Sequence, residues 1–216
     1  MNLEIKDQTF PGTVIQRDLM RGVSGEEFLE KIFFITDGIM LSQIKDISGV
    51  DGTTLQNWVK RGWIGNTVNK RYSKNQLARI LIVNMLRGCM RLETIDFLLK
   101  YINGTINYEE DDIIPEATLY AYICRIAEQA SEKSYMSTAE LEATVKSALA
   151  DYPERFSGAR ERLEKAMVII LTGYYASIAR DTAIDLLEEI RIGGSQPGEN
   201  PTEMKGVVVC PLGLKP

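Results

Sequence analysis

The sequence predicts a mainly α-helical protein in which a winged helix-turn-helix comes before a small helical bundle. Apolar residues recur at steps of three or four over most of the chain, which is typical of amphipathic helices. Two of these stretches follow a serine that has a glutamate three residues later, which is the spacing of a capping box. Glycine and asparagine separate the stretches and predict short turns between helices.

Residues 1–38 are predicted to form an N-terminal arm and one helix. The arm runs to Gly22 with weak periodicity and contains a Pro-Gly pair, so it is expected to be irregular. In the segment SGEEFLEKIFFITDG, Ser24 is the expected N-cap and Glu27 is its capping-box partner. This helix is expected to end before Gly38.

Residues 39–104 are predicted to form the winged helix-turn-helix. In LSQIKDISGVDGTTLQNWVKRG, helical spacing is interrupted at Gly49 and then resumes until Gly62. The next segment, WIGNTVNKRY, has the glycine and asparagines of a short hairpin, which would be the wing. Ser73 is the expected cap of the helix KNQLARILIVNMLRGC, and LETIDFLLKYIN predicts one more helix before Gly104.

Residues 105–192 are predicted to form the C-terminal helical bundle. Pro115 suits the first turn of the helix EATLYAYICRIAEQASEK. Ser137 and Glu140 form a second capping box, and a long helical pattern follows in GARERLEKAMVIILTGYYASIARDTAIDLLEEIRI. Residues 193–216 are rich in glycine, proline and asparagine, and they predict a flexible tail.

The residue types present argue against an enzyme and against a bound metal or cofactor. The chain has no histidine, which removes the commonest general base, and no phosphate-binding glycine loop is visible. Its cysteines are three in number and widely spaced, so they suggest neither a disulfide framework nor a metal cluster. The acidic run at 108–112, YEEDD, suits a solvated loop, with a divalent-cation or carboxylate site as the alternative.

A cytoplasmic location is expected because the first ten residues include acids and a lysine where an export signal would be apolar. The longest apolar region, residues 166–179, is shorter than the roughly 20 residues that cross a bilayer. No membrane partner is therefore expected.

Charge is unevenly distributed along the chain. No Asp or Glu occurs from Gly52 to Leu92, while this interval holds eight Lys and Arg residues. Residues 41–104 carry ten basic and four acidic residues, net +6, so the remaining residues carry −11 of the overall −5. This asymmetry favours a polyanion as the partner of the basic segment, with a merely solvated face as the alternative.

The second helix of the pair has the composition expected of a DNA-recognition helix. Its apolar side is formed by Leu55, Trp58 and Val59, and both tryptophans of the segment are interpreted as core residues and not as base-stacking platforms. Asn and Gln can bond adenine, and Arg and Lys can reach guanine or phosphate. The residues expected to face the major groove are Thr53, Thr54, Gln56, Asn57, Lys60 and Arg61, and those expected to contact the DNA backbone from the wing are Lys70, Arg71 and Tyr72.

The segment from Leu41 to Tyr101 resembles the DNA-binding domain of MerR-type transcription regulators. The turn at Gly49 and Val50, the start of the second helix at Thr54 and Leu55, and the glycine, arginine and tyrosine that follow have the order of that family. Gln56 stands where the family usually has an arginine. The resemblance implies a sequence-specific regulator that binds double-stranded DNA as a homodimer, paired through a long helix such as 158–192.

A closer resemblance joins NWVKRG and KRYSKNQLARILIVNMLR to the domain of unknown function 1836 family of uncharacterised bacterial proteins. That family implies no function of its own. A signal could be sensed through the helical half, where Tyr120, Tyr122, Tyr174 and Tyr175 are candidates for a small-molecule effector pocket, with packing in the core as the alternative. The alternative function is a non-enzymatic module that docks an acidic protein through the same basic face.

Overall fold

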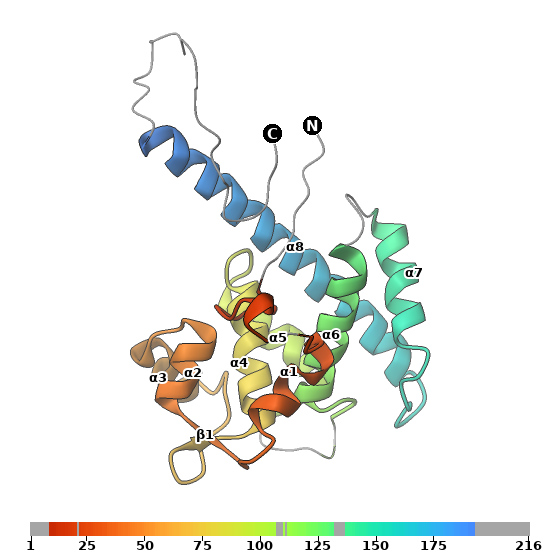
Figure 1. The fold of residues 1–216 in the computed structure, drawn as a ribbon. Helices are drawn as coiled ribbons and strands as arrows, with labels where there is room; N and C mark the ends of the chain where they lie inside the picture. The colour runs from red at the N-terminus through yellow and green to blue at the C-terminus, as the bar shows by residue number, and fades with distance from the viewer. Residues whose placement is uncertain (1–8, 21, 107–109, 111, 132–136, 193–216) are drawn as a thin grey trace.

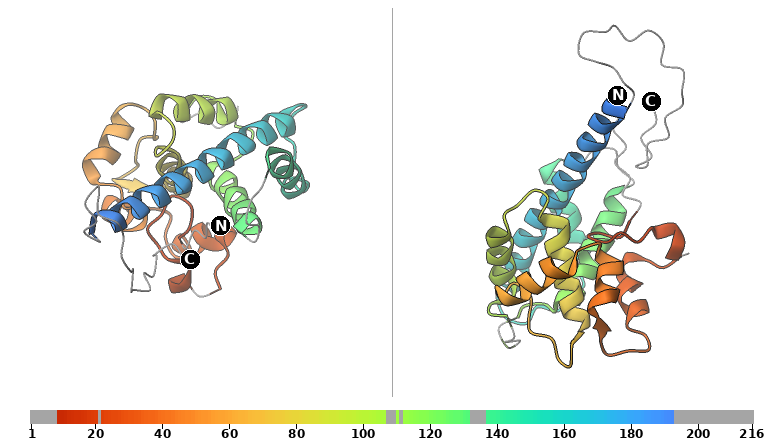
Figure 2. Two further views of the ribbon diagram at one scale, coloured as in Figure 1. Left: turned by 90° about the horizontal axis from the view of Figure 1, so that it is seen from above. Right: turned by 90° about the vertical axis from the view of Figure 1, so that its left-hand side faces the viewer.

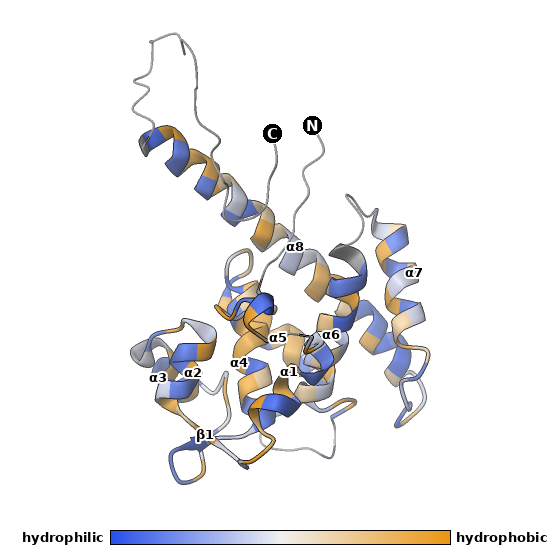
Figure 3. Cartoon of the chain, viewed as in Figure 1, coloured by the Kyte–Doolittle hydropathy of each residue, from blue (hydrophilic) through white to orange (hydrophobic). Residues whose placement is uncertain are grey.

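Helices of different lengths surround one buried helix in the computed structural model of the chain, which describes residues 9–20, 22–106, 110, 112–131 and 137–192 (Figure 1). The buried helix is α4 (Lys74–Leu86), in which all residues from Leu77 to Val83 are buried. A helix that is apolar on every side needs partners on every side. Figure 3 shows hydrophobic residues along much of α4, whereas the neighbouring helices have mixed faces.

The prediction of a mainly α-helical protein is confirmed. The elements in chain order are the 3-10 helix η1 (Arg17–Met20), α1 (Gly25–Ile32), β1 (Ile39–Met40), α2 (Leu41–Ser48), α3 (Gly52–Lys60), β2 (Arg71–Tyr72), α4, α5 (Leu92–Asn103), α6 (Glu116–Ser131), α7 (Thr138–Ala148) and α8 (Ala159–Ile192).

The predicted helix starts are confirmed at Ser24, Ser73 and Ser137. Each serine side chain accepts a hydrogen bond from the backbone N–H three residues later, and the side chain at that third position accepts from the backbone N–H of the serine. These reciprocal bonds satisfy donors that the first helical turn leaves without partners. Local sequence therefore sets where α1, α4 and α7 begin.

Helix α1 ends earlier than the sequence predicts. It stops at Ile32, and the next residues include Phe34 and Ile35, which are almost fully exposed. Beyond them the Thr36 hydroxyl donates to the carbonyl of Gly38 at 2.8 Å and forms a local turn. Such side-chain bonds to nearby backbone compete with helix formation.

Helices α2 and α3 are joined by a tight turn at Gly49. Gly49 has a φ of 69°, a left-handed conformation that favours glycine. Ahead of this pair, β1 pairs antiparallel with β2, with Ile39 opposite Tyr72 and Met40 opposite Arg71. The residues flanking the helix pair in sequence are thus held together in space.

One hydrophobic core runs through both halves of the chain. Helix α4 packs against α2, α6 and α8, and α1 packs against α6. The described part of the arm joins this core through Phe10, whose ring stacks on Phe28 with centroids 4.3 Å apart. The predicted domain boundaries at 38/39 and 104/105 stay predictions. Residues on both sides of each boundary belong to the same hydrophobic core. Residues 1–8 of the predicted arm and the predicted tail, 193–216, lie outside the described residues.

Helix α8 packs against α4, α5, α6 and α7, and its second half extends beyond the other helices (Figures 1 and 2). Gly173 lies at its close approach to the end of α4, where an added Cβ atom would lie 2.7 Å from Cε of Met90 and 2.9 Å from Cδ2 of Leu86, so these side chains would have to shift. No helix in the described part of the chain is long and apolar enough to cross a membrane.

Candidate nucleic-acid interface

Helix α3 has one buried side and one polar exposed side. Leu55 and Trp58 are buried and Val59 is half-buried, as the helical spacing predicts. The exposed side holds Thr53, Gln56, Asn57, Lys60 and Arg61. These side chains are free to meet a partner while the opposite side anchors the helix to the core.

The first turn of α3 is capped by Asp51. Its carboxylate accepts from the backbone N–H of Thr54 at 2.9 Å and from the Thr54 hydroxyl at 2.6 Å. The hydrogen bond from the Thr54 side chain is the main reason why the pKa of Asp51 lies below its usual value. Thr54, predicted to face the major groove, is half-buried and its hydroxyl is bonded within the cap.

The connection from α3 to β2 ends in a tight turn, and we call residues 65–72 the wing segment. Asn69 and Lys70 have φ values of 51° and 60°, the positive values that a type I′ hairpin turn requires, and Val68 bridges to Arg71. Lys70 and Arg71 are exposed, and a guanidinium nitrogen of Arg71 donates to the carbonyl of Gly38 at 2.9 Å. Figure 3 shows the hydrophilic character of this turn beside β1.

Tyr72 does not have the position predicted for a DNA-backbone contact. Only 5% of its surface is exposed, and this burial raises the pKa of its hydroxyl. The preceding residue of β2, Arg71, is exposed, whereas the Tyr72 side chain belongs to the core. Tyr72 is therefore removed from the predicted set.

The basic residues of the acid-free interval fall into two groups. Lys74 pairs with Glu30, and Arg79 pairs with Asp96 and Glu116. Within the described ranges, the remaining cations make no ion pair, namely Lys60, Arg61, Lys70, Arg71, Arg87 and Arg91. These unpaired side chains are the ones available to an anionic partner.

Arg79 is a structural residue of the core. Only 4% of its surface is exposed, and its Nε donates to the carbonyl of Trp63 at 2.7 Å. Its other nitrogens lie 3.2 Å from Glu116 and 3.5 Å from Asp96. It thereby joins the segment after α3 to α4, α5 and α6.

Arginines lie beside both tryptophans. The guanidinium of Arg87, which follows α4, lies 5.7 Å from the ring centroid of Trp58, and that of Arg61 lies 5.2 Å from the ring of Trp63. Trp58 is buried and Trp63 half-buried, so the interpretation of both as core residues is supported. Arg87 is an addition to the candidate set, and its place in the acid-free interval is the signal that points to it in the sequence.

The candidate effector tyrosines belong to the core. The hydroxyl of Tyr120 donates to the carbonyl of Pro11 at 2.8 Å, and that of Tyr122 donates to Asp151 at 3.0 Å. The rings of Tyr174 and Tyr175 lie 5.4 Å apart on α8. Packing in the core, the alternative for these residues, is the interpretation that these contacts support. Of the acidic run at 108–112, residues 108, 109 and 111 lie outside the described residues, so neither interpretation of the run is tested.

Residues 28–123 match the profile of a family described as Domain of unknown function (DUF1836). The chain is also 33% identical over 86 residues to "Uncharacterized protein YkrK" of Bacillus subtilis (strain 168), an alignment that covers 38% of this chain and 37% of that protein. The chain thus spans little more than a third of the length of that relative. No solved structure matches.

The matched segment begins within α1 and ends within α6, so it contains the whole of α4 and both helices of the Gly49 turn. The family that the NWVKRG segment resembles is therefore the family that residues 28–123 match, over the part of the chain that holds the exposed side of α3 and the wing segment.

Proposed function

We propose that the protein is a sequence-specific DNA-binding transcription regulator and that α2, α3 and the wing segment form a MerR-like winged helix-turn-helix. The order of two short helices, a glycine turn and a strand-paired turn supports this proposal. In such folds the second helix enters the major groove while the first crosses the DNA backbone. A regulator of this type acts where the chromosome is, in the cytoplasm of a bacterium.

The observation that carries the proposal is the polar side of α3, where exposed cations without ion pairs in the described chain lie beside exposed amides. Gln56 and Asn57 would bond adenine edges, and Lys60 and Arg61 would reach guanine or phosphate. An ordinary solvated face would more often pair its cations with nearby acids, as Lys74 and Lys100 do here.

The wing segment and Arg87 would position the protein on the DNA backbone. Lys70 and Arg71 are exposed at the tip and strand of the turn, and Arg87 lies against the tryptophan that anchors α3. Contacts of this kind set register and orientation without reading sequence. The acidic remainder of the chain, net −11, would turn the basic face toward the DNA.

The proposed regulator binds DNA as a homodimer. One small module buries little surface on DNA, and half-sites are commonly read in pairs. The second half of α8 offers the pairing surface, because Ile184, Leu187 and Ile190 recur at a spacing of three and are each about half-exposed.

The proposal is tested by titrating the purified full chain against labelled DNA from its own upstream region, with unrelated competitor DNA and at several salt concentrations. We expect specific binding that weakens as salt rises and that is lost in the double variant Lys60→Ala/Arg61→Ala. The double variant Lys146→Ala/Lys165→Ala, which removes exposed cations from α7 and α8, is the matched control and should bind normally.

Absence of binding at low salt by a folded wild-type sample would contradict the proposal. In that case the same basic face would be assigned to docking of an acidic protein, the alternative function. Equal binding of specific and competitor DNA would instead limit the proposal to nonspecific DNA binding.

A further inference from the structure

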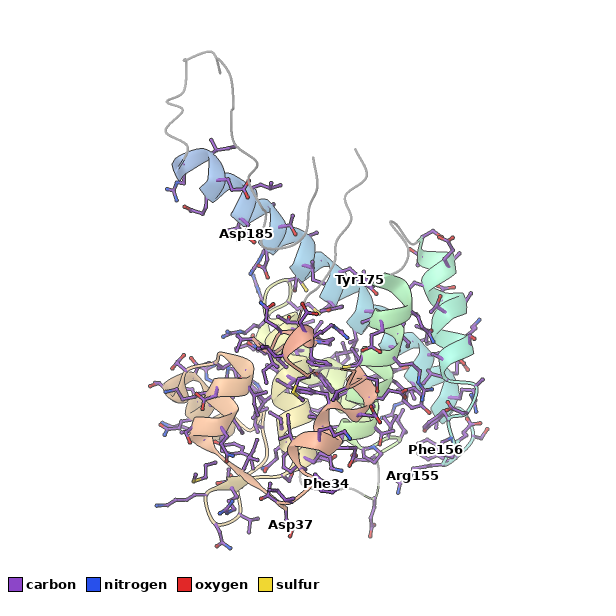
Figure 4. The ribbon with its side chains drawn as sticks, viewed as in Figure 1. Phe34, Asp37, Arg155, Phe156, Tyr175 and Asp185 are labelled. Carbon is purple, nitrogen blue, oxygen red and sulfur yellow. The ribbon has the colours of Figure 1, made fainter. Side chains whose placement is uncertain are left out.

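A cavity of about 690 Å³ lies behind the wing segment. Its described walls come from residues 35–38 before β1, from the wing segment and the start of α4, and from Asn103, Thr105, Ile106, Asp112 and Glu116. A volume of this size is typical of sites for small molecules. Figure 4 shows Asp37, which lines this cavity, at the same end of the molecule as the wing segment.

The hydroxyl of Tyr72 is without a hydrogen-bond partner in the described part of the chain, although 95% of this residue is buried and it lines the cavity. The buried polar atoms without a partner in the described chain do not include this hydroxyl, so its oxygen is open to the cavity although the ring is buried. A tyrosine hydroxyl is protonated at neutral pH, and burial raises the pKa of Tyr72 further, so this hydroxyl can donate a hydrogen bond. A ligand with an acceptor oxygen would satisfy it.

Two other donors line the cavity close to Tyr72 in sequence. The Oδ1 atom of Asn75 accepts from the backbone N–H of Ala117 at 3.1 Å, which leaves its amide hydrogens unused. Arg71 uses one guanidinium nitrogen on the Gly38 carbonyl and keeps its other donors. A guanidinium, a hydroxyl and an amide together are suited to bind a carboxylate.

The cavity also has acidic and apolar walls. Asp37 makes no ion pair within the described ranges, and Glu116 has one oxygen that is not used by Arg79. These carboxylates disfavour a polyanionic ligand and favour a group that is positively charged. Ile35 and Val68, which are 90% and 75% exposed, provide apolar surface in the same cavity.

We propose that this cavity binds a small zwitterion of the amino-acid class, an amino acid or dipeptide with apolar side chains. Its carboxylate would lie against Arg71, Tyr72 and Asn75, and its ammonium group against Asp37 and Glu116. The proposal goes beyond DNA binding and does not depend on it.

The test measures the melting temperature of the full chain with L-leucine and with leucyl-leucine as probes, in the absence of DNA. At roughly ten times its dissociation constant, a bound probe should raise the melting temperature by about 3–6 °C for a chain of this size. The N-acetyl form of each probe lacks the ammonium group and the amide form lacks the carboxylate, so each should give a smaller shift than its zwitterion. Inorganic phosphate serves as the simple-anion probe and should give none.

Two variants assign the effect to the cavity. Tyr72→Phe removes only the hydroxyl, so the shift should fall while the melting temperature without probe stays the same, because that hydroxyl bonds nothing in the described structure. Asn75→Asp keeps the acceptor for the Ala117 N–H but replaces the donor by a negative charge, and it should also reduce the shift. Tyr122→Phe is the control, since it loses a hydroxyl that lies outside the cavity and should keep the full shift.

The proposal is overturned if no zwitterion shifts the melting temperature at millimolar concentration, or if the shift is unchanged in both Tyr72→Phe and Asn75→Asp. Equal shifts from zwitterion, amide and N-acetyl forms would also overturn it, because the two charged walls would then have no role.

Discussion

Two side chains of the basic segment, Tyr72 and Arg79, face the interior, and nothing in their local sequence distinguishes them from their neighbours. Tyr72 follows two exposed cations, and Arg79 lies in an interval that otherwise holds mostly exposed ones. The acids that neutralise Arg79 are Asp96 and Glu116, which belong to other helices. Their positions depend on how α4, α5 and α6 pack, so residue-level reasoning could not assign them.

Replacing Arg79 by alanine should strongly destabilise the fold. The change leaves Glu116 with little solvent and without its cation, leaves Asp96 paired with Lys100 alone, and removes the bond to the Trp63 carbonyl. Breaking a buried ion pair by removing one partner costs about 3–5 kcal/mol. Urea unfolding followed by circular dichroism measures this, with Arg61→Ala as the exposed control. A loss below 1 kcal/mol for Arg79→Ala would show that the cluster is dispensable.

Replacing Tyr175 by phenylalanine should stabilise the protein at neutral pH. The Tyr175 hydroxyl (Figure 4) is buried without a hydrogen-bond partner, and burial raises its pKa to about 12. Removing such a group should increase the free energy of unfolding by about 1 kcal/mol.

The same substitution should also change how stability depends on pH. Because the folded-state pKa is raised, the unfolded chain ionises first, and wild-type stability falls as pH rises from about 10 toward 12. The difference between Tyr175→Phe and wild type should therefore grow above pH 10, as measured by urea unfolding across this range. A destabilised variant at pH 7 would indicate that a water molecule bonds the hydroxyl.

At the scale of elements, most of the helix starts could be predicted and contacts between helices could not. Capping serines specify α1, α4 and α7 locally, and Gly49 and Gly104 mark the ends of α2 and α5. The early end of α1 was not predicted, because the apolar run after Ile32 continues the helical pattern while Phe34 and Ile35 are exposed. Whether Phe34 and Ile35 are exposed depends on which other helices pack against this segment, and a single sequence does not predict that packing.

The second half of α8 gives a prediction for the proposed homodimer. The triple variant Ile184→Ser/Leu187→Ser/Ile190→Ser removes the exposed apolar row and should convert a dimer into a monomer without loss of helix content. Analytical ultracentrifugation measures the mass, and Ile169→Ser, in the first half of the same helix, is the control. A triple variant that stays dimeric would place the pairing surface elsewhere.

The whole molecule combines a basic face with an acidic remainder, and this distribution predicts how DNA affinity changes with salt. The double variant Arg61→Ala/Arg71→Ala removes one cation from α3 and one from the wing segment, both exposed. If each contacts one phosphate, the slope of log affinity against log salt should become shallower by about 1.8. An unchanged slope, measured by fluorescence anisotropy, would mean that neither side chain contacts phosphate.

At this scale the sequence predicts the class of fold but not the cavity behind the wing segment. The exposed side of α3 follows from the spacing of Leu55 and Trp58 alone. The cavity walls come instead from segments as far apart in sequence as Ile35 and Glu116, and they meet only because one core joins both halves of the chain. The periodicity of apolar residues does not predict which distant segments will lie side by side.

The order in which the chain is synthesised gives a further consequence of how the N-terminal arm is held. Pro11 accepts its bond from Tyr120, 109 residues later, and Arg17 pairs with Glu128, 111 residues later. The ribosome therefore releases the arm long before the helix that secures it, and native contacts at this distance form slowly. A nascent chain that stalls before α6 would leave the stacked Phe10 and Phe28 without the contacts from Tyr120, and we expect it to be a substrate for chaperones until α6 has left the ribosome.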